Sequence, residues 1–405
     1  MGEVDLLVGV PTHNNAKTVG ETVQGIRAGL LKHFPRERAV ILNVDGGSKD
    51  GTRDVVAAAS INDVQRSSDL YALRTLPCIS TVYGDTPATE VALRTVFAAA
   101  ELLRARACAI VSPESTNITM DWMERLLRPV YRDNFDLVTP VYRRHKFDGL
   151  LLRNFIYPMT RALYAKRVRE PYAVEFAFSG RFCSHLQEMQ VWDHDGGGVG
   201  TEIRMTIAAI AGGFRLYQTF LGTKPHLDRG TADLVAAMRQ TVGTLFWSAE
   251  PNFPYWSANR ETEGIPTCGA EYDLTTEPIR VNRKRLYQLF GSGVGELEPV
   301  LKSILSPQTL EDVQGIAKMS EEEFRYPHEL WVKTAYEFAS SYYKSVINRD
   351  HIIQALAPLY RGKVYTFLLE NRDASGEQVE ANVEELCLTF ERLKPYLLDL
   401  WNARE

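Results

Sequence analysis

Three loops in the first third of the chain combine carboxylate, hydroxyl and amide side chains with glycine or proline, and each follows a short apolar run. They are Pro11–Lys17, Asp45–Thr52 and Ser112–Asn117. Asp45 and Glu114 place a carboxylate close to the end of such a run. In an open α/β sheet, ligands bind outside the carboxyl ends of the strands. We therefore expect the chemistry of this chain at these loops.

The loop at Asp45 has two open interpretations. Its glycines permit tight backbone turns, and Ser48 or Asp50 can cap the helix that follows. The loop could therefore be only a well-capped connection between a strand and a helix. Alternatively, together with Pro11-x-x-Asn14 in the preceding loop, it could line a binding site. We favour the second interpretation because the pair of loops resembles the nucleotide-binding half of a known enzyme family.

The elements that must position these loops alternate between strands and helices. Strands are predicted at 6–10, 39–44, 79–83 and 108–111, and helices at 18–31, 53–59 and 89–104. This alternation predicts a parallel sheet with right-handed crossovers. From about Ala232 the pattern changes to long helices, as in the apolar repeat from Val379 to Leu400. We expect an α/β domain over residues 1–230 and a helical domain over residues 231–405.

Composition narrows the class of protein. The 405 residues carry a net charge of -5, which argues against a nucleic-acid-binding surface as the main function. The five cysteines are scattered and lack C-x-x-C spacing, a pattern that suits a reduced compartment. No window approaches the roughly 20 apolar residues of a membrane span. We expect a cytoplasmic protein.

Motifs in the middle and at the end of the chain extend the pattern of the first two loops. They are Tyr142–Gly149, Tyr157–Tyr164, Val168–Pro171, Phe178–Gly180, Val191–Trp192, Leu221–His226 and Leu356–Lys363. Together with Pro11-x-x-Asn14 and Asp45, they resemble the GT-A glycosyltransferases related to bacterial glucosylglycerate and glucosyl-3-phosphoglycerate synthases. The resemblance implies an α/β GT-A fold, a Rossmann-like and mostly parallel sheet flanked by helices, with an α-helical C-terminal region.

The resemblance also implies an activity. Such enzymes move a sugar, here glucose or mannose, with retention from a UDP- or GDP-linked donor to a small hydroxy-carboxylate such as glycerate or 3-phosphoglycerate. It assigns the donor to Pro11, Thr12, Asn14, Asp45, Gly46, Ser112 and Lys224. It assigns Mg²⁺ or Mn²⁺ to Glu114 and His226, and catalysis to Glu202 and Glu114. Glu202 could instead be a carboxylate favoured in the first turn of a helix, and His226 a hydrogen-bonded loop residue.

The acceptor would be held by residues from three of the motifs. These are Arg144, Lys146, Asp148, Arg161, Ser179 and Gly180. Arginine offers a planar fork for a carboxylate or phosphate, and small residues let the acceptor approach backbone N–H groups. A solvated basic loop would explain Arg144 equally well, and Asp148 could be a turn former.

Two segments depart from the family pattern, and they motivate a second hypothesis. Ser112-Pro113-Glu114 stands where the family has two acids of a DxD pair, and Pro87-Ala88-Thr89-Glu90 stands where it has Pro-Gly-Lys-Gly. Asp193, His194 and Asp195 could supply compensating ligands. The alternative is therefore a catalytically impaired relative that binds a nucleotide or sugar in a regulatory or partner role. The helical tail, with Trp331 and Trp401, could support a homodimer.

Overall fold

The computed structural model describes residues 3–61, 76–84, 89–189, 200–224, 234–258, 261–269, 279 and 281–403. It divides into two compact units. The sheet unit comprises Met1–Arg143, Tyr172–Pro225 and Ile265–Leu274, and the helical unit comprises Arg144–Pro171, His226–Gly264 and Thr275–Glu405. This division differs from the single boundary expected at residue 230. The chain leaves the sheet after its fifth strand, contributes residues 144–171 to the helical unit, and then returns.

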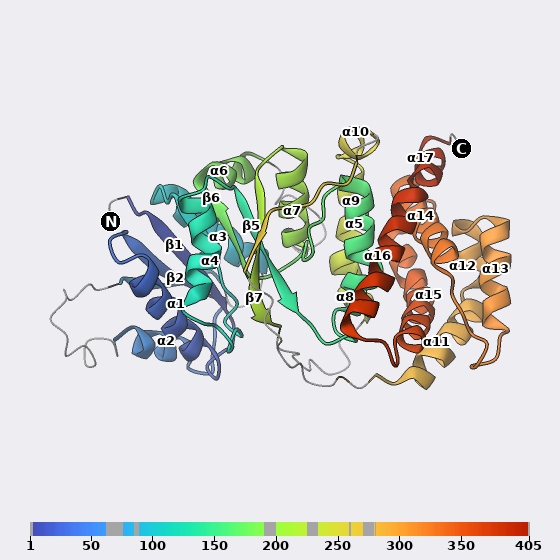
Figure 1. Ribbon diagram of the computed structural model, residues 1–405, viewed down its shortest axis with the longest axis horizontal. Helices are drawn as coiled ribbons and strands as arrows, with labels where there is room; N and C mark the ends of the chain where they lie inside the picture. The colour runs from blue at the N-terminus through green and yellow to red at the C-terminus, as the bar shows by residue number, and fades with distance from the viewer. Residues whose placement is uncertain are drawn as a thin grey trace. The chain divides into compact units, whose positions relative to one another are not determined.

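An eight-stranded sheet forms the centre of the sheet unit, with strand order β3-β2-β1-β4-β6-β5-β7-β8 (Figure 1). The strands are β1 (Leu6–Thr12), β2 (Ala39–Asp45), β3 (Cys78–Val82), β4 (Ala107–Ile110), β5 (Leu137–Arg143), β6 (Phe176–Ser179), β7 (Leu216–Thr223) and β8 (Thr267–Cys268). Neighbouring strands are parallel except that β6 runs antiparallel to both β4 and β5. The predicted α/β class with a mostly parallel sheet is confirmed, and this is the architecture expected of a GT-A fold.

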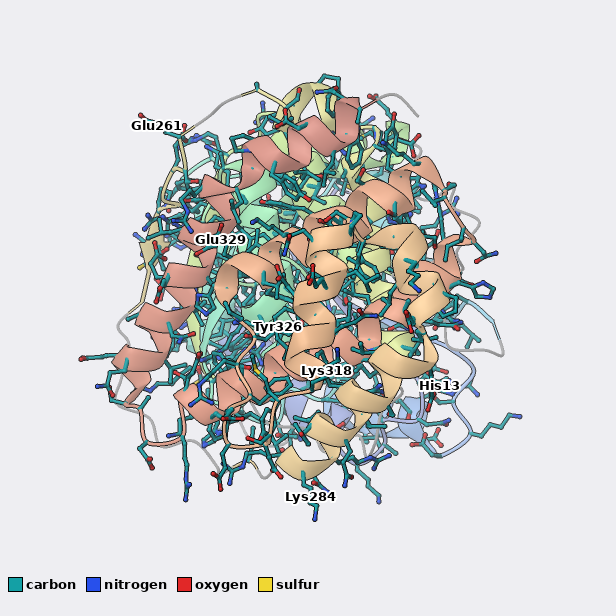
Figure 2. The ribbon with its side chains drawn as sticks, turned by 90° about the vertical axis from the view of Figure 1, so that its right-hand side faces the viewer. His13, Glu261, Lys284, Lys318, Tyr326 and Glu329 are labelled. Atoms are coloured by element: carbon teal, nitrogen blue, oxygen red, sulfur yellow. The ribbon has the colours of Figure 1, made fainter. Side chains whose placement is uncertain are left out.

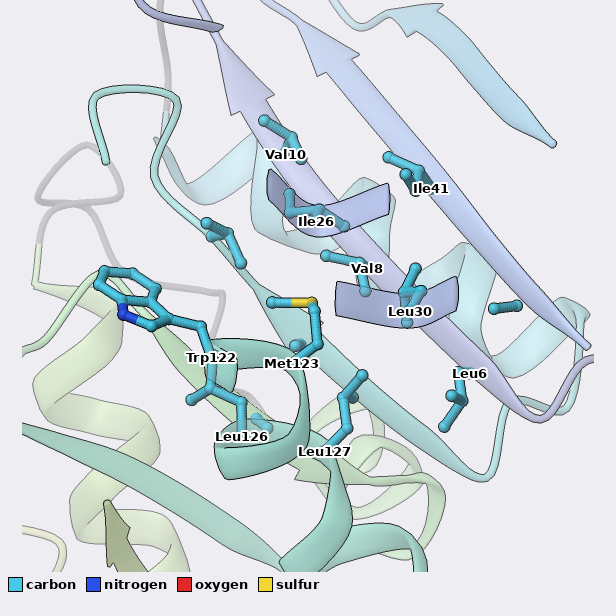
Figure 3. Packing of buried hydrophobic residues seen from close by; sticks show 14 of the residues in the cluster. Leu6, Val8, Val10, Ile26, Leu30, Ile41, Trp122, Met123, Leu126 and Leu127 are labelled. Carbon is cyan, nitrogen blue, oxygen red and sulfur yellow. The ribbon is translucent and has the colours of Figure 1, made fainter. Parts of the chain in front are cut away.

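Helices cover both faces of the sheet. Those of the sheet unit are α1 (Val19–His33), α2 (Thr52–Ile61), α3 (Thr89–Leu102), α4 (Asp121–Tyr131), α6 (Gly180–Glu188) and α7 (Thr201–Ala211). Figure 3 shows alternate residues of β1, from Leu6 to Val10, packed with Ile26 and Leu30 of α1 and with a run of apolar side chains on α4 that begins at Trp122. On the opposite face, a side chain at Gly9 would come within 2.8 Å of Val96 in α3. This glycine therefore allows α3 to pack directly on β1.

Among its described residues, the helical unit consists of helices and one isolated β-bridge between Lys166 and Glu263. The helices are the π-helical segments η2 (Leu152–Ile156) and η4 (Arg239–Gly243), and α5 (Tyr157–Tyr164), α8 (Leu234–Met238), α9 (Thr244–Ala249), α10 (Phe253–Trp256), α11 (Arg283–Glu296), α12 (Glu298–Ile304), α13 (Pro307–Ala317), α14 (His328–Lys344), α15 (Arg349–Glu370), α16 (Gly376–Arg392) and α17 (Lys394–Asn402). None of the described helices is long and apolar enough to cross a membrane.

The predicted apolar repeat of the tail is split between two helices. Its first half lies in α16, where Val379, Val383 and Phe390 are buried. The helix ends at Arg392, and α17 begins at Lys394 with a proline in its first turn. A proline is accepted there because the first N–H groups of a helix have no intrahelical partner.

Both tryptophans that suggested a dimer surface are internal to the helical unit. Trp331 is fully buried, and its indole N–H donates to the carbonyl of Asn154 at 2.9 Å. The ring of Trp401 stacks on Tyr343, with 4.1 Å between centroids. These residues therefore serve the core of this unit, and they supply no argument for a homodimer.

A buried lysine in α15 is expected to limit the stability of this unit. Lys363 is fully buried, and no described group accepts a hydrogen bond from its Nζ. Burial lowers its pKa from 10.5 to about 8, against the opposing charges of Glu370 and Glu385. Burial also lowers the pKa of His328, and the Lys363 cation adds to that effect. Burying the Lys363 cation costs the folded state about 3 kcal/mol at pH 7.

We therefore expect Lys363→Met to raise the free energy of unfolding by about 3 kcal/mol at pH 7. The folded lysine binds its proton less tightly than the unfolded one, so the gain is full below about pH 8 and disappears between pH 8 and 10.5. Urea unfolding, monitored through the hydrogen exchange of α15 peptides, would measure this gain in stability. Lys284→Met is the matched control, because Lys284 is exposed on α11 (Figure 2). An equal change in the free energy of unfolding in the two variants would contradict the account of Lys363.

Candidate functional site

The ends of β1 and β2 bring two of the predicted donor residues together. Strand register pairs Thr12 with Asp45, and Pro11 precedes them as a partner of Val44. The Thr12 hydroxyl donates to Asp45 Oδ1 at 2.8 Å and accepts from Asn43 Nδ2 at 2.8 Å. The parallel register thus places the first two loops side by side at the carboxyl edge of the sheet.

The Asp45 carboxylate holds the second loop as well. Ser48 donates its N–H to Oδ2 at 2.8 Å and its hydroxyl to Oδ1 at 2.6 Å. Burial opposes ionisation of Asp45, but these bonds, the Thr12 hydroxyl and the charge of Arg53 hold its pKa below the ordinary value. Asp45 is fully buried. The resemblance implied direct contact with the donor, whereas the structure shows a carboxylate enclosed by the protein that joins the two loops.

Further hydrogen bonds connect the two loops. The backbone N–H of Asn14 donates to the Ser48 hydroxyl at 2.8 Å, and the Asn14 side chain accepts from the N–H of Lys49 at 3.0 Å. Asn15 N–H donates to Thr52 Oγ1 at 2.8 Å. Asn14 has a φ of 55°, a left-handed conformation that asparagine tolerates better than most residues. Asn14 therefore shapes the rim of the site through its backbone as well as its exposed side chain.

Gly46 lies between two ring side chains at this edge. His13 Nδ1 is 2.8 Å from the Gly46 carbonyl, and a Cβ on Gly46 would come within 2.6 Å of Tyr83 Oη. His13, labelled in Figure 2, and Tyr83 are both partly exposed. Neither ring was singled out from the sequence, although His13 lies inside the first loop. The absence of a side chain at position 46 therefore lets the Tyr83 hydroxyl lie close to the backbone.

The third loop follows β4, which pairs with the other side of β1. The N–H of Glu114 lies 3.3 Å from the Ser112 hydroxyl, and the Pro113 carbonyl accepts from Thr22 of α1 at 3.2 Å. Glu114 and Ser112 are both partly exposed. Because the strand order is β2-β1-β4, all three predicted loops lie at adjacent strand ends. We call this set of loops the donor edge; it comprises Pro11–Lys17, Asp45–Thr52 and Ser112–Asn117.

The described residues contain no group of three or more His, Cys, Asp or Glu side chains that could hold a metal. Glu114, with the neighbouring Ser112 hydroxyl, provides oxygen ligands at the donor edge. Mg²⁺ commonly binds one or two carboxylates and completes its shell with phosphate oxygens and water, so this donor set fits a metal that arrives with a diphosphate. His226, Ala88 and the stretch 193–195 lie outside the described residues, and their assignments stay predictions.

Lys224 does not extend freely from the end of β7. Its Nζ lies 2.7 Å from the carboxylate of Glu175, which is fully buried. The sequence analysis missed Glu175. Its signal is a single carboxylate within the otherwise uncharged run from Ala173 to Phe178. The predicted donor cation is thus already paired within the sheet unit.

Glu202 lies in the first turn of α7, as predicted. Burial raises its pKa, although its own helical N–H and the charge of Arg204 oppose the rise. Arg204 is buried, and burial lowers its pKa against the charges of Glu90 and Glu202. Arg204, which no motif singled out, therefore lies in the electrostatic field of the Glu90 carboxylate.

Ser179 and Gly180 lie at the opposite edge of the sheet from the donor edge. Strand β6 runs antiparallel to β4, so Ser179 pairs with Ala107 at the start of β4. The Ser179 hydroxyl donates to Asp136 at 2.9 Å and accepts from Phe182 N–H as the cap of α6. A Cβ on Gly180 would come within 2.8 Å of the Ala105 carbonyl. Both residues therefore have structural contacts, and we leave them out of the proposed site.

The other four predicted acceptor residues belong to the helical unit, where each has partners. Arg144 donates to both oxygens of Glu170, at 2.8 and 2.9 Å, and to Asp148 at 2.8 Å. Lys146 Nζ lies 2.7 Å from the Arg372 carbonyl. Arg161 is fully buried. Its guanidinium binds carboxylates of α16, so the structure gives it a role in packing.

Comparisons with known proteins gave matches among solved structures. No family model and no curated protein matches the chain. Three matching structures are of glucosyl-3-phosphoglycerate synthase from Mycobacterium tuberculosis. One contains Mn²⁺, UDP and glucosyl-3-phosphoglycerate (19% identity, TM-score 0.46), one Mg²⁺ and UDP (20%, 0.46), and one Mn²⁺, UDP-glucose and phosphoglyceric acid (19%, 0.44). Each match covers 61% of this chain and 80% of the other. The chain is similar to this synthase at low sequence identity.

Proposed function

We propose that this chain is a nucleotide-sugar glycosyltransferase whose donor binds at the donor edge. The observation that carries the proposal is the register of β2, β1 and β4, which sets three polar loops beside one another at the carboxyl ends of parallel strands. This is where open α/β sheets bind their ligands. UDP- and GDP-linked glucose or mannose are the proposed donors, and transfer with retention to glycerate or 3-phosphoglycerate is the proposed reaction.

Each part of the donor edge has a proposed role. The rings of His13 and Tyr83 beside Gly46 are the proposed stacking partners of the base, and Thr12 and Asp45 hold the two loops together. Ser112 and Glu114 face the diphosphate. Glu114 would hold Mg²⁺ or Mn²⁺, and the assignment of His226 as a second ligand stays a prediction from its motif. A divalent cation bound there stabilises negative charge on the leaving diphosphate.

Glu202 is the proposed catalytic carboxylate. A carboxyl group whose pKa is raised by burial can accept and return a proton closer to neutral pH than an ordinary glutamate can. It would accept a hydrogen bond from the acceptor hydroxyl. The acceptor assignments of Arg144, Lys146 and Asp148 stay predictions from their motif.

Calorimetry with UDP and GDP, with and without MnCl₂, tests the donor half of the proposal. We expect one of the two nucleotides to bind. The Asp45→Ala substitution should weaken this binding at least about tenfold, because the two loops lose the hydrogen-bond acceptor that they share. Asp54→Ala, in the first turn of α2 and outside the network, is the control. Failure of either nucleotide to bind the wild-type chain would overturn the proposal.

A second candidate is a relative that binds the nucleotide but transfers no sugar. The observation that favours it is the pairing of Lys224 with Glu175, together with Ser112 in place of a carboxylate. Transfer of sugar from UDP- or GDP-glucose or -mannose to glycerate or 3-phosphoglycerate separates the two candidates. Turnover that is lost in Glu114→Ala would eliminate the second one, and nucleotide binding without turnover would support it.

A further inference from the structure

Glu175 immediately precedes β6, the antiparallel strand in the middle of the sheet. Because β6 runs against β4, its first residue pairs with Ile110 at the end of β4, and Glu175 therefore lies at the carboxyl edge beside the loop of Ser112 and Glu114. None of its surface is exposed. A buried carboxylate is costly unless donors surround it.

Three donors from three different segments surround this carboxylate. The hydroxyl of Ser115, in the loop after β4, donates to Oε1 at 2.9 Å. The hydroxyl of Tyr142, near the end of β5, donates to Oε2 at 2.7 Å, and Lys224 Nζ, just after β7, donates to the same oxygen at 2.7 Å. Burial raises the pKa of Glu175, but Lys224 and these hydrogen bonds outweigh burial and lower it. The group is therefore a carboxylate anion joined to three strand ends.

Other contacts hold the same strand ends together. Asn117 Nδ2 donates to the Thr223 carbonyl at 2.6 Å, and the Lys224 N–H donates to the Arg143 carbonyl at 3.1 Å. The Lys224 ammonium also lies 4.7 Å from the centre of the Tyr142 ring. About a quarter of the Lys224 side chain stays exposed, so this cation is close to the surface of the edge.

We infer that Glu175 is a positioning residue of the donor edge. Through Ser115 it fixes the loop that carries Glu114, and through Lys224 it holds back a cation that would otherwise bind the diphosphate directly. The inference rests on the proposed function and deepens it, because it assigns the neutralisation of the diphosphate to a cation at Glu114 and not to Lys224. Binding of a nucleoside diphosphate should then depend on Mn²⁺ or Mg²⁺.

Calorimetry of UDP and GDP with MnCl₂ and with EDTA tests the inference without an activity assay. In the wild-type chain we expect Mn²⁺ to tighten binding of the nucleotide about tenfold or more. Glu175→Gln keeps one oxygen that can accept from Ser115, whereas its NH₂ group cannot accept from Tyr142 or Lys224. The variant therefore removes the charge that holds Lys224. In EDTA we expect this variant to bind the nucleotide about tenfold more tightly than the wild-type chain does, which corresponds to the energy of one charge-assisted hydrogen bond. Mn²⁺ should then increase its affinity for the nucleotide only slightly. In Glu175→Gln/Lys224→Met the gain in EDTA should disappear.

A merely structural role gives a different result. It predicts that Glu175→Gln weakens binding equally with MnCl₂ and with EDTA, and that outcome would overturn the inference while the proposed function stands. Equal affinity of the wild-type chain for the nucleotide in MnCl₂ and in EDTA would also overturn the inference. Absence of any nucleotide binding by the wild-type chain would instead overturn the proposed function and the inference together.

Ser115→Ala keeps the test decisive if Glu175→Gln fails to fold. Removal of this hydroxyl frees the Glu114 loop from Glu175 but leaves the pair with Lys224. We expect about a tenfold loss of nucleotide affinity in MnCl₂ and no change in EDTA, a loss of the size of one hydrogen bond to a charged group. Ser60→Ala is the control, since its hydroxyl donates to the Val56 carbonyl within α2 and lies outside the donor edge. Equal losses in MnCl₂ and EDTA would count against the inference.

Discussion

Glu202→Gln is expected to lower kcat for sugar transfer by about 10²–10⁴-fold while nucleotide affinity stays within about twofold, the range for loss of a general acid or base. Glu202 lies in the first turn of α7, where burial raises its pKa. If its ionised form is required, wild-type kcat rises with pH through a pKa above that of an ordinary glutamate. Glutamine cannot titrate, so the variant should lose this limb of the profile. Steady-state kinetics between pH 4 and 9 would measure both effects.

Glu188→Gln provides the matched comparison for this experiment. Glu188 is the last residue of α6 and is exposed. It should leave kcat and the pH profile unchanged. A Glu202→Gln variant that retains both full turnover and the acidic limb would show that the carboxylate serves only the first turn of its helix.

Arg161→Ala is expected to reduce the free energy of unfolding of the helical unit by about 2–3 kcal/mol, because it removes charge-assisted hydrogen bonds of a buried guanidinium, while the side chains of Glu384 and Glu391 stay 39% and 23% exposed. The guanidinium donates to both oxygens of Glu384, at 2.6 and 2.9 Å, and to Glu391 at 2.8 Å. Thr262 also donates to Glu391, so part of the network remains in the variant. Urea unfolding, monitored through the hydrogen exchange of α16 peptides, would measure this loss of stability.

Two further substitutions separate a packing role of Arg161 from a role in binding the acceptor. Arg167→Ala removes a half-exposed guanidinium 3.6 Å from Glu384, and it should cost no more than about 1 kcal/mol. Arg161→Lys should be destabilising as well, because an ammonium cannot reproduce the fork that spans both carboxylates. If Arg161→Ala left stability intact but weakened binding of 3-phosphoglycerate, the acceptor role implied by the resemblance would be correct.

The first half of the fold could be predicted because its signals are local. Short apolar runs that end in polar loops mark β1, β2 and β4, and the parallel register then places Thr12 beside Asp45 without further information. The direction of β6 could not be predicted in this way. Its four residues look the same in a parallel or an antiparallel strand, yet the direction decides that Ser179 lies far from the donor edge and Glu175 beside it.

The buried charges escaped sequence reasoning for another reason. Arg161 and Glu384 are separated by 223 positions, and Glu175 and Lys224 by 49, so no local pattern joins either pair. A charged residue inside an apolar stretch signals only that a partner exists somewhere. The same limit explains the domain boundary, since residues 144–171 belong to the helical unit through contacts with residues late in the chain.

A crystal structure of the chain with UDP and MnCl₂, with data collected at the manganese absorption edge, tests the central claim most directly. We predict the nucleotide at the donor edge, its base near Gly46, and an anomalous peak whose ligands include Glu114 and the diphosphate. A nucleotide bound elsewhere, or a diphosphate held by Lys224 without manganese at Glu114, would contradict the account of this site.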